Sequence, residues 1–413
     1  MGRLAASVVT AGCLASACGQ AQVASPPDPE FTRGSQAAPT IITVAPGGTE
    51  GDLILPSDIE ADVETLDGSF DVGRMVLVDD AGAAVPDPAR WAAFDDALVR
   101  RLGANQAFGV AVMIDGQLVH HAAHGDRVAG GESVEAGDRF RVASISKTIT
   151  AIVTMQLIED GVLSLDEPIG SIVADHLGVA APDGDAVSAT VRDLLSHTAG
   201  FPKHEGTFFG SGSASCSDAA TQGIVANVSS GTGYRYSNMG YCVLGVLIEA
   251  VTGKTYERVV DERLLGPLGI DGMRFTGTHE LGPDEVSHAV TPGRNYMEAL
   301  GAAGSWNATP ADLVAILNAI DHDTAGWKAV SAETARSMRF RADTGQQPGG
   351  YGLGLINYES DAWGHTGTIE NTHAMVLRQT DGVTWAITVA GGYPSSSGQL
   401  RYLIRSAMVE AFG

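Results

Sequence analysis

The side chains best suited to chemistry lie in the stretch RVASISKTI, residues 141–149. Ser144 and Lys147 are three positions apart, directly before an apolar run at helical spacing, so they lie one turn apart on one face of the expected helix. A serine hydroxyl is a poor nucleophile until a neighbouring base takes its proton. A lysine acts as that base only when desolvation or nearby cations lower its pKa, which a buried helix start can supply. The pair predicts a nucleophile and its base, although Ser-x-x-Lys alone also arises by chance.

A second candidate motif is YRYSNMGY, which contains Tyr236, Ser237 and Asn238. In an extended segment alternate residues point the same way, so Tyr236 and Asn238 would share a face. They would present a phenol for proton transfer and an amide that holds a peptide group. The alternative is a turn before a helix that starts near Met239, with Asn238 as its cap.

A third candidate motif, WGHTGTIENTHAMVL, places His365, Thr366, Gly367 and Thr368 at the start of an expected strand. Glycine there lets the backbone of a substrate approach closely. The alternative is a loop histidine that enters a strand. The order along the chain is Ser-x-x-Lys, then Tyr-x-Asn, then His-Thr-Gly.

The elements that would position these residues follow from periodicity. Residues 88–102 have apolar side chains at three- and four-residue spacing, which predicts an amphipathic helix. Two apolar runs flank Asp115-Gly116 and two more flank Asp381-Gly382, and each pair predicts a β-hairpin. Thr309 has the pattern of an N-cap, with Pro310 in the first turn and Asp312 three residues after the cap. Strands at both ends with helices between them favour an antiparallel sheet closed by distant segments.

The three motifs, SISK, YSN and HTG, together resemble the serine hydrolases that include class C β-lactamases, D-alanyl-D-alanine carboxypeptidases and related esterases. Supporting stretches include VRDLLSHTAGFP and GTGYRYSNMGYCVLGVLIEAVTGKTYE. The resemblance covers residues 88–413. It implies an α+β fold of the β-lactamase/transpeptidase-like kind, with an antiparallel sheet flanked by helices. A largely helical subdomain, residues 150–340, would be inserted between the first and third motifs.

The resemblance also implies roles. Ser144 would be the acylated nucleophile, and Lys147 and Tyr236 would share general base and acid work. Asn238 would hold the substrate amide. The backbone N–H groups of Ser144 and Thr368 would form the oxyanion hole, which stabilises the charge of the tetrahedral intermediate.

Further substrate contacts are implied along the third motif. A substrate peptide would lie as an added strand after Thr366, in contact with Thr366 and Gly367. Trp306 falls where family members build a wall of the active site, with core packing as the alternative. His365 would be a catalytic-site residue that replaces the lysine of many β-lactamases. Because histidine is largely neutral near pH 7, it provides less fixed charge for a substrate carboxylate, and HTG resembles the carboxypeptidase and esterase members more closely.

The expected function is an extracytoplasmic serine acyl hydrolase, most like a D-alanyl-D-alanine carboxypeptidase or a small-substrate esterase. β-Lactams would be acylating ligands, and efficient β-lactamase activity is the weaker expectation. The alternative is a slowly acylating penicillin-binding lipoprotein that serves as a sensor or cell-wall binding module. No cofactor and no metal are expected. His120 and His124 share a face of an expected strand but lie about 13 Å apart along it, too far for one ion.

The N-terminus has the pattern of an export signal. Arg3 precedes a mostly apolar or small run, and LASAC, residues 14–18, resembles a bacterial lipobox that would lipidate Cys18. Cys13 is a weaker alternative, and a cleaved signal without lipid is another. The expectation is a signal over residues 1–18 and export, with a lipid anchor on the outer face of a bacterial membrane as the single membrane contact, or secretion if no lipid is added.

Residues 19–87 are predicted to be an acidic spacer containing Pro, Ser and Ala, ordered where it lies on the catalytic domain of residues 88–413. The formal net charge of −24 repels phosphate backbones, which excludes nucleic acid as an expected partner. Cys216 and Cys242 remain after the signal. In an oxidising compartment they are expected to form a disulfide, with two buried free thiols as the alternative.

Overall fold

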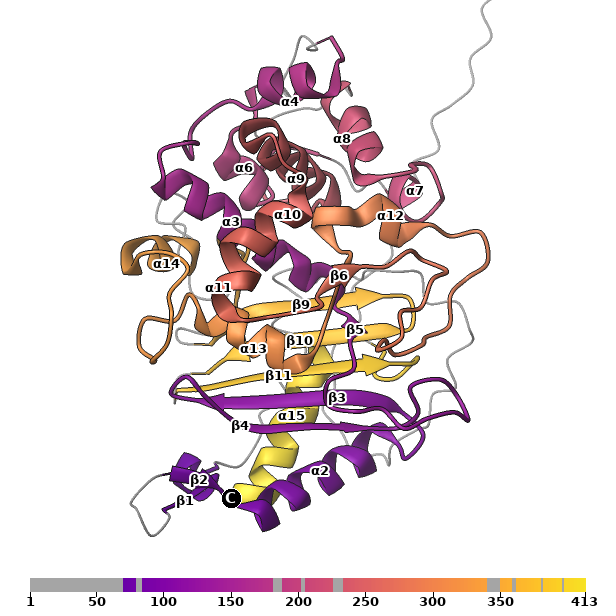
Figure 1. Ribbon diagram of the computed structural model, residues 1–413, viewed down its shortest axis with the longest axis vertical. Coiled ribbons are helices and arrows are strands. Elements are labelled where there is room, and N and C mark those ends of the chain that lie inside the picture. The colour runs from indigo at the N-terminus through magenta and orange to yellow at the C-terminus, as the bar shows by residue number, and fades with distance from the viewer. Residues whose placement is uncertain are drawn as a thin grey trace, which may run out of the picture. The chain divides into compact units, whose positions relative to one another are not determined.

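A six-stranded antiparallel sheet, in the order β4-β3-β11-β10-β9-β8, divides the molecule into two sides (Figure 1). The computed structural model describes residues 70–78, 84–180, 188–201, 205–225, 233–339, 350–358, 362–379, 382–395 and 397–413, all within the unit Gly48–Gly413. The predicted signal, Cys18 and most of the predicted spacer lie outside these residues. The antiparallel sheet flanked by helices confirms the predicted α+β fold class.

The strands of the structure have these bounds: β1 Val76–Val78, β2 Ala84–Pro86, β3 Ala107–Ile114, β4 Gln117–His124, β5 Phe140–Arg141, β6 Arg274–Phe275, β7 Trp306–Ala308, β8 Ile356–Asn357, β9 Trp363–Ile369, β10 Thr372–Arg378 and β11 Val383–Ala390. The helices are α2 Pro88–Leu102, α3 Ser146–Glu159, α4 Gly170–Leu177, α6 Val191–Leu195, α7 Glu205–Phe208, α8 Cys216–Val225, α9 Asn238–Thr252, α10 Tyr256–Val260, α11 Gly266–Leu268, α12 Tyr296–Leu300, α13 Pro310–Asn318, α14 Ala332–Arg339 and α15 Gly398–Phe412. Short helical turns are η1 Val72–Arg74, η2 Ala143–Ile145, η3 Asp261–Leu265 and η4 Gly301–Ala303.

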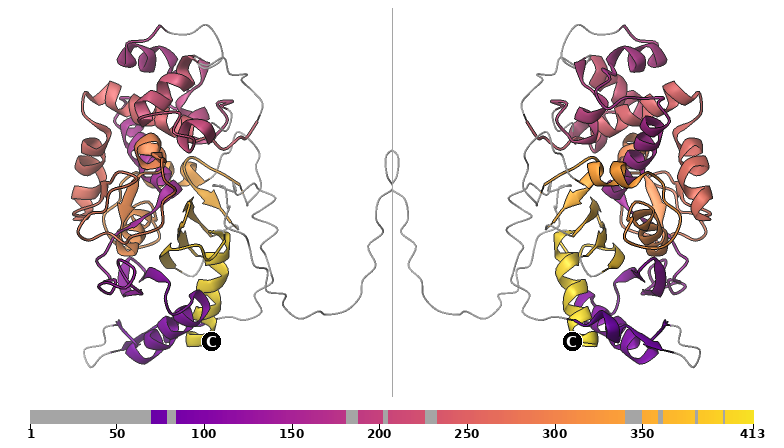
Figure 2. Two further views of the ribbon diagram at one scale, coloured as in Figure 1. Left: turned by 90° about the vertical axis from the view of Figure 1, so that its right-hand side faces the viewer. Right: turned by 90° about the vertical axis from the view of Figure 1, so that its left-hand side faces the viewer.

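One side of the sheet is covered by α2 and α15, which lie side by side (Figures 1 and 2). Their apolar side chains form one core with alternate residues of β3, β10 and β11. Glu410 of α15 pairs with Arg100 and Arg101 of α2, which ties the two helices together at their exposed edge. Helices from opposite ends of the sequence therefore close the same side of the sheet.

The other side of the sheet carries the helical part of the molecule between α3 and α13 (Figure 1). A small sheet, β5-β7-β6, joins this part to the strand that precedes the first motif. α3 and α9 lie in the largest apolar core, and α3 is buried continuously from Ser146 to Leu157. The first turn of α3 is therefore buried on every side, which provides the desolvation of the lysine that the Ser-x-x-Lys hypothesis requires.

Several predicted elements are confirmed in detail. α2 covers the 15 residues predicted for it and buries Trp91, Phe94, Leu98 and Leu102. Thr309 caps α13 in a capping box with Asp312. The turn between β3 and β4 has positive φ at both Asp115 and Gly116, as a two-residue hairpin loop of this type needs.

Residues 70–78 and 84–87, which belong to the predicted spacer, pack on the α2 and α15 side of the sheet. Met75 is fully buried, and its carbonyl accepts a hydrogen bond from Trp91 Nε1 at 2.9 Å. The Asp71 amide donates to the Phe412 carbonyl at 3.3 Å. The short apolar cluster around Met75 covers core surface that α2 and α15 leave open, so this stretch belongs to the domain.

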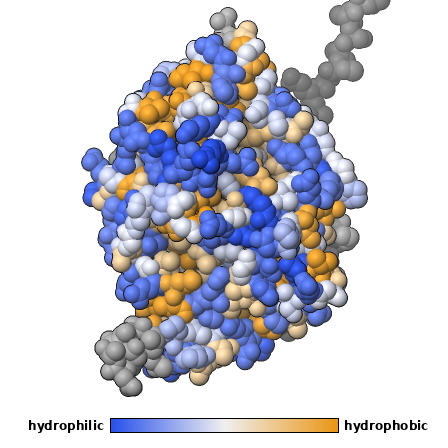
Figure 3. All heavy atoms as spheres, in the orientation of Figure 1, coloured by the Kyte–Doolittle hydropathy of each residue, from blue (hydrophilic) through white to orange (hydrophobic). Residues whose placement is uncertain are grey.

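The face shown in Figure 3 is predominantly hydrophilic, with apolar groups in small, separate areas. Exposed large apolar side chains among the described residues come from distant parts of the chain: Leu118, Val128, Val162, Val225, Leu281, Trp327, Tyr393 and Tyr402. Scattered single side chains of this kind are ordinary on a protein surface. In the part of the chain that the structure describes, no helix has both the length and the apolarity to cross a bilayer.

Candidate active site

Ser144 lies in η2, the turn between β5 and α3, and is half-buried. The preceding residue, Ala143, has a φ of 49°, a conformation uncommon for residues other than glycine. Gly367 of β9 lies directly against this turn, and a Cβ on Gly367 would overlap the Val142 carbonyl. The glycine is therefore needed for the close approach of β9 to the turn that presents Ser144.

Lys147, in the first turn of α3, has no exposed surface. Its ammonium group donates to Ser144 Oγ at 3.0 Å, Asn238 Oδ1 at 2.8 Å and the Ala303 carbonyl at 2.7 Å. Burial lowers the pKa of Lys147 well below its usual value, because desolvation disfavours the charged amine. A neutral amine in this place would donate to Asn238 and Ala303 and offer its lone pair to the Ser144 proton. The geometry thus suits a general base.

Tyr236 and Asn238 meet at the same pair, although they belong to different local structures. Ser237 is extended and caps α9, which begins at Asn238, so the cap is Ser237 and not Asn238. The Tyr236 hydroxyl shares a hydrogen bond with Ser144, and its ring lies 4.9 Å from Lys147 Nζ. Burial holds the pKa of Tyr236 well above its usual value, so the phenol is protonated and can donate a proton.

His365 is buried on the same side, in β9. Its Nε2 lies 2.9 Å from the Tyr351 hydroxyl, and its Nδ1 lies 2.6 Å from the Thr366 carbonyl oxygen. A carbonyl only accepts, so Nδ1 carries the proton and Nε2 accepts from Tyr351. Burial, and secondarily the charge of Lys147, lower the pKa of His365 to about 3. His365 is neutral near pH 7 and supplies no fixed positive charge.

The register of β9 separates the residues of the third motif. His365 and Gly367 lie opposite Val376 and Ala374, which belong to the core on the Ser144 side. Thr366 lies opposite Met375, which packs in the α2 and α15 core. The side chain of Thr366 therefore points to the far face of the sheet. The backbone of Thr366 is the part that a substrate paired as an added strand would contact.

The backbone of Thr368 is better placed. Ile369 and Thr372 flank a two-residue turn, and such a flanking pair is hydrogen-bonded across the hairpin. Because pairs alternate along the ladder, the N–H and C=O of Thr368 point away from β10, as do those of Thr366. β8 pairs with Trp363 and Gly364, and among the described residues no strand pairs with this edge of β9 beside Thr368. The position is compatible with the predicted oxyanion role.

Trp306 does not line the site as predicted. It is 1% exposed and packs against Tyr256 and Phe275, with its ring nitrogen 3.2 Å from the Tyr256 hydroxyl. The pairing of β7 with both β5 and β6 turns the indole into the core. Core packing, the alternative considered from the sequence, is what the structure has.

Three contributors were not assigned to the site from the sequence. The Ala303 carbonyl belongs to the backbone, so no pattern of side chains in the sequence predicts it. Tyr351, from the glycine-rich stretch GGYGLGL, holds His365. His197, interpreted from the sequence as structural, is buried with its ring 4.2 Å from that of Tyr236, and its Nδ1 accepts from the Ser237 amide at 3.0 Å. The sequence feature that could have drawn attention to His197 is its position directly after Ser196 in LSHTAGF.

Two of the three histidines in β4 have structural partners. His120 lies 2.7 Å from Asp95 and stacks on Trp91, and His124 lies 3.0 Å from the Ala104 carbonyl oxygen. Within the described ranges no group of three or more His, Cys, Asp or Glu side chains is placed to hold a metal ion.

An antiparallel sheet with a serine and a buried lysine one turn apart at the start of a helix defines the class as the serine hydrolase superfamily of penicillin-binding proteins and their relatives. The family model described as beta-lactamase matches residues 95–408, and the chain belongs to that family. A relative named penicillin-binding protein 4, from Amycolatopsis lactamdurans, is 29% identical over 299 residues, 68% of this chain and 74% of that one.

Other similarities differ in coverage. A putative fimbrial assembly protein FimD of Dichelobacter nodosus is 29% identical over 229 residues, 51% of this chain. The match spans 56% of that relative, little more than half its length. A solved structure of SurE with D-Leu has a TM-score of 0.62 at 25% identity, covering 78% of this chain and 75% of that one. The fold also resembles a D-stereospecific amidohydrolase from Streptomyces sp., with a TM-score of 0.61 at 23% identity over 78% and 98% of the two chains.

Proposed function

We propose that this chain is an extracytoplasmic hydrolase that forms an acyl-enzyme on Ser144. The observation that carries the proposal is the hydrogen bond from a fully buried Lys147 to Ser144 Oγ at 3.0 Å, with Tyr236 bonded to the same hydroxyl. Ser144, Tyr236, Asn238 and Thr368 are half-buried, so a substrate reaches them, whereas Lys147 is shielded from water.

The reaction follows from these contacts. Lys147 takes the Ser144 proton while the oxygen attacks the acyl carbon, and the backbone N–H groups of Ser144 and Thr368 hold the resulting oxyanion. Tyr236 donates a proton to the leaving amine or alcohol as the intermediate collapses to the ester. The same groups activate water against the ester, which releases the acid and restores Ser144. With its oxygen bonded to Lys147, the Asn238 amide has N–H donors for a substrate carbonyl.

The substrate class proposed is small acyl donors: D-alanyl peptides of the cell wall, short-chain esters or small amides. The neutral His365 gives less attraction for a substrate carboxylate than a lysine would. Among these donors the weaker attraction favours esters and amides without a carboxylate, and the HTG pattern is what supports a carboxypeptidase over an efficient β-lactamase, with β-lactams as acylating ligands.

Export and a lipid on Cys18 remain part of the proposal. The LASAC pattern supports them, and so does the Cys216–Cys242 disulfide, because such bonds persist in oxidising compartments. Radiolabelled palmitate incorporation into the full chain, compared with Cys18→Ala, tests the anchor. Equal labelling of both proteins would refute it.

The first test of the chemistry measures the intact mass of the protein after incubation with a penicillin. The Ser144→Ala variant, treated in the same way, is the control. A persistent adduct of one drug molecule, absent in the variant, is the expected result and indicates slow deacylation. Rapid drug hydrolysis would point to a β-lactamase. An adduct together with no turnover of D-alanyl peptides, amides or activated esters would favour the penicillin-binding sensor. No adduct and no turnover of any of these would refute the proposed function.

A further inference from the structure

The disulfide between Cys216 and Cys242 lies close to Lys147's hydrogen-bond partners. Cys216 is the first residue of α8, and Cys242 lies in α9, one helical turn after Asn238. The two Cα atoms are 5.2 Å apart. Cys242 is fully buried and Cys216 is half-buried, so the bond lies within the packed part of the molecule.

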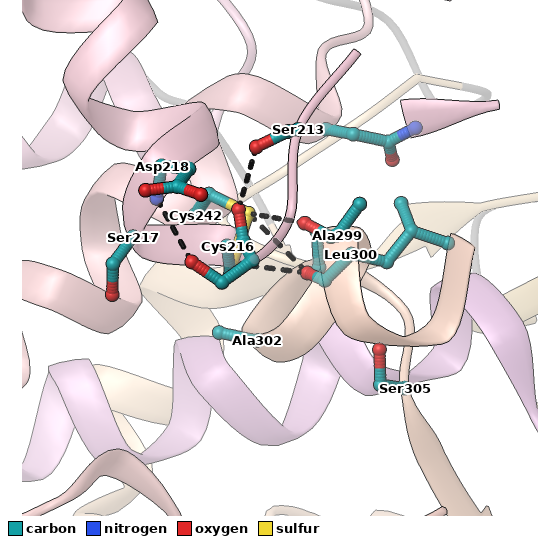
Figure 4. Close-up of a disulfide and its surroundings, with 12 residues drawn as sticks. Ser213, Cys216, Ser217, Asp218, Cys242, Ala299, Leu300, Ala302 and Ser305 are labelled. Atoms are coloured by element: carbon teal, nitrogen blue, oxygen red, sulfur yellow. Dashed lines mark hydrogen bonds between the residues drawn. A yellow bond between two sulfur atoms is a disulfide. The ribbon is translucent and has the colours of Figure 1, made fainter. Parts of the chain in front are cut away.

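Both sulfur atoms contact the backbone just before η4 (Figure 4). Cys216 Sγ lies 3.1 Å and Cys242 Sγ 3.3 Å from the Leu300 carbonyl oxygen. A disulfide sulfur carries no proton, so these are close contacts and not donated hydrogen bonds. Gly301 has a φ of 42°, and a Cβ built on it would lie 2.5 Å from Cys216 Cβ. The disulfide therefore fills the space beside the first residue of η4.

η4 and α9 each supply one acceptor to Lys147. η4 ends at Ala303, whose carbonyl lies 2.7 Å from Nζ, and α9 begins at Asn238, whose Oδ1 lies 2.8 Å from it. The two segments also touch directly, because a Cβ on Gly245 of α9 would lie 2.7 Å from Ala302 Cβ. The disulfide is bonded to α9 and packed on the segment that leads into η4, so it constrains both acceptors.

These two acceptors fix two of the three hydrogen-bonding directions of the amine, and the third is directed at Ser144. We propose that Cys216 and Cys242 are positioning residues for acyl transfer, an inference that rests on the proposed function. Their bond keeps the Ala303 carbonyl and the Asn238 side chain in place and so aims Lys147 at Ser144.

Reduction separates this role from a general effect on the fold. A dithiol converts the bond to two thiols and itself becomes the cyclic disulfide. The sulfurs then move apart by roughly 1.5 Å, since they must reach non-bonded contact, and they displace the Leu300–Gly301 backbone. α8 stays packed on α9 without the bond, because Gly223 lies against the Met239 side chain so closely that a Cβ there would be 2.6 Å from it. The reduced chain is expected to stay folded, with the Ala303 carbonyl and the Asn238 side chain held less rigidly.

The test uses the lysine side chains as probes, because the chain has only four: Lys147, Lys203, Lys254 and Lys328. Lysine carrying carbon-13 at the ε position gives one resonance each, and Lys147→Arg identifies the Lys147 signal. We expect the pKa of Lys147 to rise by about one pH unit on reduction, as water reaches the amine. In the reduced protein kcat should fall about tenfold while KM stays within about twofold. This is the pattern expected when an interaction that stabilises only the transition state is lost. Reoxidation should restore both.

Two comparisons make the result decisive. The double variant Cys216→Ala/Cys242→Ala should resemble the reduced protein, whereas Leu403→Ala, which weakens the α15 core, should leave the Lys147 titration unchanged. An unchanged Lys147 titration on reduction would overturn the proposal, as would a reduced chain that unfolds, since the bond would then serve the fold only. Absence of Ser144 acylation in the oxidised protein would count against the proposed function, and the titration would still decide the positioning role.

Discussion

The two sides of the sheet are built on opposite principles. On the α2 and α15 side, α15 buries one apolar stripe and leaves its other face in solvent. On the Ser144 side, α3 is buried all round and carries polar side chains into the core, among them Lys147, Thr150 and Thr154. Thr150 and Thr154 donate to backbone carbonyls, whereas none of the partners of the Lys147 amine among the described residues is a carboxylate.

This difference separates stability from chemistry. Apolar burial is favourable wherever it occurs, so the α2 and α15 side stabilises the fold. A buried amine without a counter-charge costs free energy, and it persists because the surrounding core is large enough to hold it. Strand β9 serves both sides, since its alternate residues face the two cores.

The largest expected effect is that of Lys147→Met, which removes the amine and keeps the length of the side chain. kcat for an activated ester should fall about 10³-fold, because Ser144 loses its base. The free energy of unfolding should change by less than about 2 kcal/mol, since relief of the amine's desolvation offsets the two acceptors left unpaired. Steady-state kinetics and urea unfolding measure the two quantities. A variant that keeps kcat within tenfold of the parent would remove Lys147 from the mechanism.

Leu403→Ala tests the opposite side. Leu403 is 4% exposed in the α2 and α15 core, and its truncation should cost about 3 kcal/mol of unfolding free energy. kcat and KM of the folded fraction should stay within about twofold, because this residue packs in the core across the sheet from Ser144. A tenfold fall in kcat at a temperature where the variant is folded would show that the two sides are coupled.

Gly367→Ala changes the strand that the two sides share. The added Cβ would overlap the Val142 carbonyl and push the Ser144 turn away from β9. We expect kcat to fall about 100-fold, as misplacement of reacting groups by about an ångström typically does. Gly364→Ala is the matched control: its Cβ would overlap the Val376 carbonyl in the same sheet, so it should lower stability and affect kcat less. Equal losses of kcat in both variants would argue against a specific role for the approach at Gly367.

The same alternation explains what the sequence could and could not predict. Local patterns were sufficient for α2, the α13 cap and the Asp115-Gly116 hairpin, because each depends on neighbours in sequence. Which of the two cores each residue of β9 faces follows from period-two alternation only once the register with β10 is known. The Ala303 carbonyl had no signal, because a backbone acceptor is selected by packing over 156 positions and not by residue type.

Burial also explains the error at Trp306. An aromatic residue near a motif suits a pocket wall and a core equally well, and only the pairing of β7 with β5 and β6 decides between them. The placement of His197 was likewise decided by tertiary structure, where a ring next in sequence to Ser196 packs on Tyr236, 39 positions later.

The smallest expected effect concerns the acid stability of the Ser144 side. The pKa of His365 is about 3 in the folded chain against 6.5 ordinarily, so below pH 6.5 the unfolded state binds a proton that the folded state does not. Stability from this residue is fully present above pH 6.5 and is lost as the pH falls toward 3, by about 2 kcal/mol at pH 5. His365→Gln, which does not titrate, should therefore lose less stability between pH 7 and pH 5.

Urea unfolding of the parent, His365→Gln and Leu403→Ala at both pH values measures this difference. Leu403→Ala should keep the pH dependence of the parent, because an apolar truncation binds no proton. His197, His288 and His373, whose pKa values burial also lowers, remain in all three proteins and contribute to the residual slope. If His365→Gln and the parent lose stability equally, the core does not lower the pKa of His365, and the account of a histidine kept neutral by burial would be wrong.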